Sequence, residues 1–149
     1  VALIVPRVSI IAPPEEWDAL TLWASTVFLE ASGETFEGMC AISWVIRCRM
    51  DRRKLSAREI ILQPFQFSCW NPPRHRSEAR LISAEGASWE NAWKASSGAL
   101  WRLLPDPTDG ADHYLNEALT KKIRGGTLPL WFDPEKVTAK IGAHTFLRL

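Results

Sequence analysis

The stretch from Leu22 to Gly38 constrains this chain most, because it joins an apolar helical pattern to a glycine break with two acids beside it. Apolar residues recur at spacings of three and four, which is typical of one buried helix face: Trp17, Leu20, Ala24, Val27, Phe28 and Ala31. Prolines and acids at residues 13–16 predict the start of this helix. Ser32-Gly33 predicts its end, since glycine takes the left-handed cap conformation without a Cβ penalty.

Glu30 is the candidate catalytic residue on this helix. We expect Trp23, Val27 and Phe28 to wall its carboxyl group. Apolar walls penalise the charged form, so the group is expected to keep its proton near neutral pH. That is the state that a general acid needs. Position alone leaves open a helix-end carboxylate without a catalytic role.

Length and charge limit the possible classes of protein. A chain of 149 residues fits one compact domain, here residues 15–149 after an N-terminal extension of residues 1–14. With 18 Lys and Arg against 17 Asp and Glu, the formal charge of +1 creates no protein-wide field for nucleic acid. The extension is apolar but too short to span a bilayer, and it lacks the basic start of a signal peptide. We therefore expect a monomer with neither a nucleic-acid partner nor stable membrane insertion.

The remaining patterns are helical first and extended late. Thr35 can cap a second helix that ends in a basic run, residues 47–54, which suits either a polyanion contact or a solvated helix end. Ser56 to Glu59 has the pattern of a capping box, and Trp89 to Leu103 that of a third long helix.

Several connections and a late hairpin complete the pattern. Residues 65–73 predict an aromatic loop, 74–87 a polar connection and 121–126 a basic loop. The tail from residue 137 suits a hairpin that turns near Gly142-Ala143. The predicted fold class is α+β, mainly helical with a small late β-hairpin or sheet.

The order of motifs resembles that of the SleB-type cell wall hydrolase family, the spore-cortex-lytic enzymes and their bacterial and phage relatives. The matching segments are Val27 to Glu34, Gln66 to Trp70, Asp106 to Ala111, His113 to Asn116, Trp131, and Thr138 to Phe146. The resemblance covers nearly the whole chain. It implies a lysozyme-like domain, akin to soluble lytic transglycosylases, that acts on the glycan strands of peptidoglycan.

The family's catalytic glutamate is the first acid of a Gly-Glu-Ala-Arg-Gly-Glu motif, which falls on Glu30. Two residues depart from that motif, because Leu29 replaces the usual glycine and Ser32 the usual arginine. Leu29 leaves less space around the backbone beside Glu30 than glycine would, and the serine at position 32 removes a possible charge partner of Glu34. We expect these changes to alter the cleft and to keep the chemistry.

Cleavage of a glycosidic bond usually needs two carboxyl groups, about 5–5.5 Å apart in retaining enzymes and about 6.5–9.5 Å apart in inverting ones. Gly33 is expected to break the helical geometry that would place Glu34 beside Glu30, so Glu34 is assigned to the next helix or to a hydrogen bond in the cleft. A lytic transglycosylase needs one glutamate, because the substrate's own 6-hydroxyl attacks the anomeric carbon.

Further residues are expected to bind the sugar. Gln66 and Ser68 can hydrogen-bond acetamido groups, Tyr114 and Asn116 can orient Glu30 or the substrate, and Trp70 and Trp131 can stack on sugar rings. Each has a structural alternative: core packing for the indoles, a turn for Asn116 and a hydroxyl tied to the backbone for Tyr114.

Other chemistries have weaker support. The three histidines show no compact metal spacing and there is no GxSxG motif, so neither a metal, a cofactor nor a zinc amidase is expected. The three cysteines are expected to be mostly buried thiols, with one disulfide left open.

The sequence thus predicts a lytic transglycosylase that cleaves the MurNAc-GlcNAc β-1,4 bond at the cell wall. The single domain, with no evident wall-binding repeat, favours a phage-type endolysin. A muramidase-type hydrolase, a non-catalytic glycan-binding module and a nucleic-acid module are the alternatives.

Overall fold

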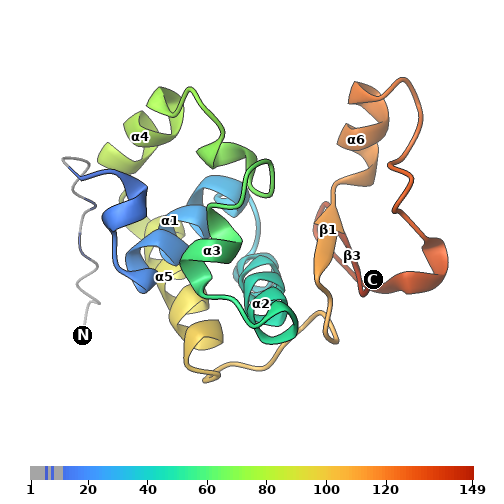
Figure 1. The fold of residues 1–149 in the computed structure, drawn as a ribbon, viewed down its shortest axis with the longest axis horizontal. Coiled ribbons are helices and arrows are strands. Elements are labelled where there is room, and N and C mark those ends of the chain that lie inside the picture. Colours follow the sequence, from blue (N-terminus) through green and yellow to red (C-terminus); the bar gives the residue numbers. More distant parts are fainter. Residues whose placement is uncertain (1–5, 7, 9–11) are drawn as a thin grey trace.

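Two long helices from the first third of the sequence lie at the centre of the molecule (Figure 1). The computed structural model describes residues 6, 8 and 12–149, so the expected N-terminal extension lies mostly outside the described residues. α1 (Ala19–Ala31) is capped by Asp18, whose side chain accepts a hydrogen bond from the Thr21 N–H. α2 (Phe36–Arg53) is capped by Thr35, as the sequence predicts, and the Thr35 side chain accepts a hydrogen bond from the Gly38 N–H. The two helices and the turn between them carry both acids of the motif.

The bounds and burial of α1 differ from the prediction. Residues 14–16 form only a 3₁₀ turn, η1 (Pro14–Glu16), because Trp17 is extended with φ −72° and ψ 153°. The helix ends at Ala31, but Gly33 does not adopt the left-handed conformation; the Glu34 N–H closes the turn on the Ala31 carbonyl at 2.9 Å. Nearly every residue after Thr21 is buried, so α1 is a central helix and not an amphipathic one.

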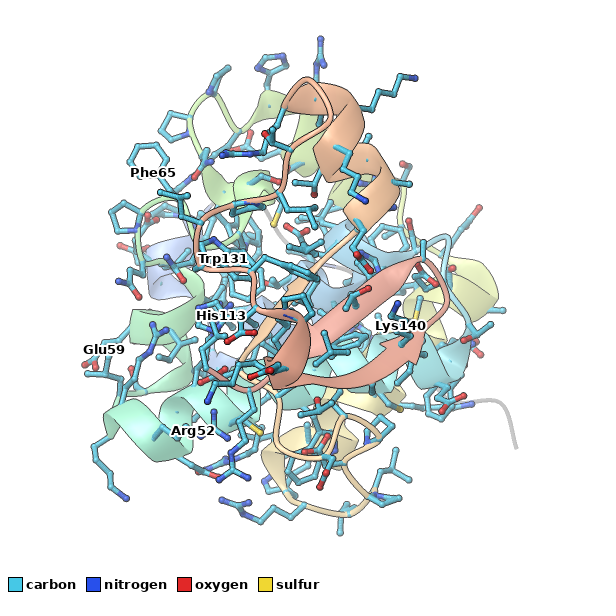
Figure 2. The ribbon with its side chains drawn as sticks, turned by 90° about the vertical axis from the view of Figure 1, so that its right-hand side faces the viewer. Arg52, Glu59, Phe65, His113, Trp131 and Lys140 are labelled. Carbon is cyan, nitrogen blue, oxygen red and sulfur yellow. The ribbon has the colours of Figure 1, made fainter. Side chains whose placement is uncertain are left out.

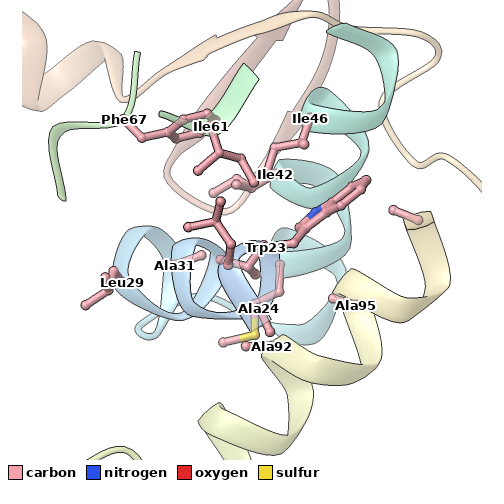
Figure 3. Close-up of a cluster of buried hydrophobic side chains, with 14 of the residues drawn as sticks. Trp23, Ala24, Leu29, Ala31, Ile42, Ile46, Ile61, Phe67, Ala92 and Ala95 are labelled. Atoms are coloured by element: carbon pink, nitrogen blue, oxygen red, sulfur yellow. The ribbon is translucent and has the colours of Figure 1, made fainter. Parts of the chain in front are cut away.

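Large apolar side chains pack around α1 and α2 to form the core (Figure 3). Trp23 is 0% exposed, and its indole N–H donates to the Ser43 hydroxyl at 2.8 Å, which satisfies the polar atom inside the core. α3 (Ala57–Ile61) starts with the predicted capping box of Ser56 and Glu59. α5 (Gly86–Leu100) packs against both central helices and confirms the third long helix.

The aromatic loop divides between the core and the surface. Phe67 and Trp70, the latter in η2 (Ser68–Trp70), are 1% and 3% exposed, whereas Phe65 is 84% exposed. The connection after it is not merely polar loop, because α4 (His75–Ile82) occupies much of residues 74–87. α4 lies over the end of α1, above η2 (Figure 1).

A small antiparallel sheet packs on one side of the helical body (Figure 1). Its strands are β1 (His113–Leu115), β2 (Val137–Ile141) and β3 (His144–Leu147), in the order β1-β3-β2. β2 and β3 form the predicted hairpin around Gly142. α6 (Glu117–Ile123) and η3 (Pro134–Lys136) lie between β1 and β2, so part of the expected basic loop is helical.

The basic run at the end of α2 is used for contacts within the protein. Arg47 pairs with Asp51, and Arg52 pairs with Asp112 next to β1. Arg49 is buried and donates to the Asp112 carbonyl at 2.6 Å. The solvated-helix-end interpretation therefore fails for Arg49. Arg49 and Arg52 fasten the sheet to α2, whereas Arg47 pairs within α2. In the described part of the chain, no helix is both long and apolar enough to cross a bilayer.

Asp112 links the sheet to α2 through its ion pair with Arg52, and its contribution to the stability of the fold should depend on pH. Burial acts to raise its pKa, but hydrogen bonds from His113, the Leu149 N–H and Arg52 together hold the pKa below its ordinary value. A carboxyl group whose pKa is lower in the folded state stabilises the fold above the unfolded pKa of about 3.9, and this stabilisation is lost as the pH falls through the folded value.

We predict that Asp112→Asn lowers the free energy of unfolding by about 1–3 kcal/mol at pH 7. The difference from the wild type should shrink below about pH 4, where the wild-type carboxyl group takes up its proton. Urea unfolding at both pH values measures this. Asp109→Asn, an exposed acid in the neighbouring turn, is the control and should change stability little at either pH. A loss that is equal at pH 7 and pH 3 would contradict the assignment.

Candidate active site

Glu30 lies in the last turn of α1 and faces a cavity of about 350 Å³ at the protein surface. The cavity is lined by Leu29, Glu30, Ser68, Cys69, Pro73, Arg76, Ser77 and Arg80. The expected apolar wall is wrong, because Trp23 and Val27 are fully buried in the core and Phe28 packs on Trp89. Apart from Leu29 and Pro73, the surroundings are polar and basic.

Two groups from different elements hold the Glu30 carboxyl group. The Cys69 N–H of η2 donates to Glu30 Oε1 at 3.5 Å. The Tyr114 hydroxyl of β1 comes close to Glu30, and burial, with the Glu30 charge adding to it, raises the pKa of Tyr114 well above its ordinary value. A tyrosine that keeps its proton can donate to a neighbouring carboxyl group. That Tyr114 orients Glu30 stays a prediction.

The Tyr114 ring is fixed by its neighbours on the sheet. It is paired in register with Phe146 on β3, with ring centroids 5.8 Å apart, and it meets the edge of His144 at 5.3 Å. The Arg49 guanidinium lies over the Phe67 ring at 5.5 Å and is close enough to Tyr114 to oppose the rise in its pKa. The hydroxyl is thus delivered by a rigid aromatic cluster.

Glu34 does not line the Glu30 cavity, and its carboxylate is held by the hairpin. Its Oε1 lies 3.1 Å from His144 Nδ1, and both side chains are about 15% exposed. An added Cβ at Gly142 would lie 2.1 Å from Glu34 Oε2, so the hairpin turn touches the carboxylate directly. His144 therefore supplies the partner that Glu34 was expected to lack, and Glu34 serves the sheet contact.

Arg80 of α4 touches both positions at which the chain departs from the family motif. Its guanidinium donates to the Leu29 carbonyl at 3.0 Å and to the Ser32 hydroxyl at 2.8 Å. It also lies over the Phe28 ring, 5.6 Å from the centroid. The positive charge that is missing from position 32 is therefore supplied in space by another helix.

The other predicted site residues divide into three groups. Ser68 lines the cavity beside Glu30. The stacking role of Trp70 is wrong, because its indole is buried, donates to Thr26 Oγ1 at 2.9 Å and meets Trp17 edge-on. Asn116 caps α6 by accepting from the Leu119 N–H at 3.0 Å, which is its structural alternative.

Gln66 and Trp131 lie outside the lining of the Glu30 cavity. Gln66 is partly buried in the loop before η2. Trp131 is 41% exposed and lies against His113, with ring centroids 5.2 Å apart (Figure 2). Its binding role, like that of Gln66, stays a prediction.

Sequence reasoning missed four residues at this site: Cys69, Arg76, Arg80 and His144. Arg76 and Arg80 lie four residues apart in a segment that was expected to be a polar connection, and that spacing on a helix is the signal that could have found them. The three cysteines are free thiols, and burial raises the pKa of Cys40 and Cys48 to about 11. Among the described residues, no three His, Cys, Asp or Glu side chains form a group that could hold a metal ion.

Comparison with known proteins identifies relatives of this fold. The model of a family described as cell wall hydrolase matches residues 33–147. That range includes every predicted site residue except Glu30, whose assignment rests on the geometry above and on the motif. No curated protein matches the chain.

Two solved structures resemble the chain. The catalytic domain of the Bacillus cereus SleB protein is 24% identical with a TM-score of 0.64, over 87% of this chain and 89% of that one. The catalytic domain of the germination-specific lytic transglycosylase SleB from Bacillus anthracis is 22% identical with a TM-score of 0.63, over 97% of this chain and all (100%) of that one. These likenesses confirm the fold.

The contact between Gly142 and Glu34 predicts a difference between two glycine substitutions. Gly142 and Gly125 both have a left-handed φ, +58° and +66°, but an added Cβ at Gly125 meets nothing within 4 Å. Gly125→Ala should cost about 1 kcal/mol from backbone strain alone. Gly142→Ala should cost about 1–3 kcal/mol more, because Glu34 must leave His144. Thermal unfolding measures both variants, and equal losses would contradict the contact.

Proposed function

The chain belongs to the cell wall hydrolase family, which makes it a peptidoglycan-degrading enzyme, and we propose that it cleaves the MurNAc-GlcNAc β-1,4 bond as a lytic transglycosylase with Glu30 as its catalytic residue. The observation that carries the proposal is the geometry of Glu30. It ends a buried helix, faces a surface cavity, accepts a hydrogen bond from the Cys69 N–H and lies close to the Tyr114 hydroxyl.

In the first step, the protonated Glu30 carboxyl group gives its proton to the glycosidic oxygen. The bond between that oxygen and the anomeric carbon of MurNAc breaks, and the GlcNAc side leaves as an alcohol. Positive charge develops on the sugar ring as the bond breaks. The Glu30 carboxylate left behind keeps the hydrogen bond from the Cys69 N–H, so it remains positioned for the second step.

In the second step, the 6-hydroxyl of the same MurNAc attacks its own anomeric carbon. The Glu30 carboxylate accepts the hydroxyl proton, which forms a 1,6-anhydro ring and restores the acid. An attack within one molecule needs no bound water and gains an effective molarity of about 10⁵–10⁸ M when it is well oriented.

The environment of Glu34 supports a mechanism with one carboxyl group. Glu34 is the nearest acid in the motif, and its carboxylate is engaged by His144 and packed against the hairpin turn. A hydrolase would need a second carboxylate to activate water or to form a glycosyl intermediate. We also propose that the enzyme acts at the wall as a monomer, because Glu30, Cys69 and Tyr114 all come from one chain.

We predict that Glu30→Gln abolishes lysis of purified sacculi while binding stays near the wild-type level. The amide is similar in shape but cannot transfer the proton, and a general acid is worth about 10²–10⁴ in rate. Turbidity measures lysis, and a pull-down with insoluble sacculi measures binding. Glu16→Gln, an exposed acid in η1, is the control and should lyse normally. A non-catalytic glycan-binding module would show no lysis in the wild type.

We predict that Tyr114→Phe lowers kcat by about 10- to 100-fold with little change in KM. The substitution removes the hydroxyl that lies close to Glu30, where a hydrogen bond to the carboxyl group would be worth about 1.5–3 kcal/mol, and keeps the ring between His144 and Phe146. Steady-state release of soluble muropeptides gives both constants. A rise in KM at unchanged kcat would assign Tyr114 to substrate binding instead of to Glu30.

A further inference from the structure

Two arginines that share one helix, α4, line the cavity beside Glu30. Arg76 and Arg80 are four residues apart on α4, which places them on one face, and both line the Glu30 cavity. α4 is held in position from both sides. The Ser77 hydroxyl donates to the Cys69 carbonyl at 2.7 Å, and Arg80 donates to the Leu29 carbonyl at 3.0 Å. Arg80 is therefore fixed relative to the Glu30 carboxyl group, and Arg76 lines the same cavity from the same helix.

The charges of these arginines are not balanced by the protein. Arg80 contacts only neutral groups, namely a carbonyl, a hydroxyl and a ring face. Arg76 is exposed, and within the described part of the chain it makes neither an ion pair nor a hydrogen bond. Glu30 is the one acid among the described residues that line the cavity, and it is engaged by Tyr114 and Cys69. A net positive cavity that faces solvent suits an anionic ligand.

The proposed substrate carries such an anion next to the bond that is cleaved. Each MurNAc bears a lactyl group on its 3-oxygen, whose carboxyl group is either free or extended by a peptide stem with acidic residues. A guanidinium binds a carboxylate through two parallel hydrogen bonds, which gives orientation as well as affinity. The ligand chemistry that fits Arg76 and Arg80 is therefore a carboxylate of the muramoyl substituent.

We propose that Arg76 and Arg80 form a carboxylate-binding subsite that selects strands by the acidic substituent of MurNAc. The inference rests on the proposed function, because it takes the Glu30 cavity as the glycan site. Arg80 is anchored on α1 and sets the field of the subsite. Arg76 is exposed, lines the cavity and makes the contact with the carboxylate.

The test compares Arg76→Gln with the wild type on three preparations of glycan strands. The first carries intact stems, the second has lost its stems to an amidase and keeps the lactyl carboxylates, and the third has its carboxylates converted to neutral amides. On strands that carry the recognised carboxylate, Arg76→Gln should raise KM by about tenfold, which corresponds to the loss of one charge-assisted hydrogen bond, and kcat should stay nearly unchanged. On the amidated strands the variant and the wild type should have the same KM. Lys94→Gln, which removes an exposed charge from α5, is the matched control.

The pattern over the three preparations identifies the carboxylate. A KM effect only on strands with stems assigns the contact to a carboxylate of the stem, an effect only on the stem-free strands assigns it to the lactyl carboxylate, and an effect on both shows that the subsite binds either one. Equal KM values for Arg76→Gln and the wild type on all strands would overturn the subsite and leave the proposed function intact. A wild-type enzyme that releases no product from any strand would overturn the proposed function and the subsite with it.

Discussion

The close approach of the Tyr114 hydroxyl to the Glu30 carboxyl group joins the sheet to the helical body of this molecule. Glu30 comes from α1, which cannot shift easily because it is buried on nearly every side. Tyr114 comes from β1, whose position depends on the contacts of Arg49 and Arg52 with Asp112. The ionic contacts at the end of α2 therefore decide where the hydroxyl stands. Stability and catalysis are linked through this one docking interface.

The site shows how tertiary contacts replace a residue that a sequence motif has lost. The family motif has an arginine at position 32, where this chain has serine. Arg80 reaches that position from α4 and bonds both Ser32 and the Leu29 carbonyl. His144 pairs with Glu34 from the hairpin. The charges near the motif are thus kept although the residues that carry them have changed, and Arg80 brings its charge into the Glu30 cavity.

Local signals in the sequence predicted several caps and the hairpin turn but not the start of α1 or the conformation of Gly33, and they failed where distant segments meet. The Thr35 cap, the Ser56 capping box and the hairpin were predicted correctly because each depends on a few adjacent residues. The apolar wall of Glu30 was wrong, since periodicity gives one helix face and not the elements that cover the others. A similar limit explains Trp70 and α4: nothing local separates a core indole from an exposed one, and α4 has only eight residues, so its pattern covers little more than two turns.

In the proposed mechanism, Glu30 serves both proton transfers and the substrate's own hydroxyl, not water, attacks the anomeric carbon. Digestion of purified sacculi in water labelled with heavy oxygen tests this most directly, with mass spectrometry of the released muropeptides. Attack by the 6-hydroxyl predicts anhydro products that carry no label, because no oxygen atom of water enters the new bond. Reducing products that carry one labelled oxygen at the anomeric position would contradict it and assign the enzyme to hydrolysis.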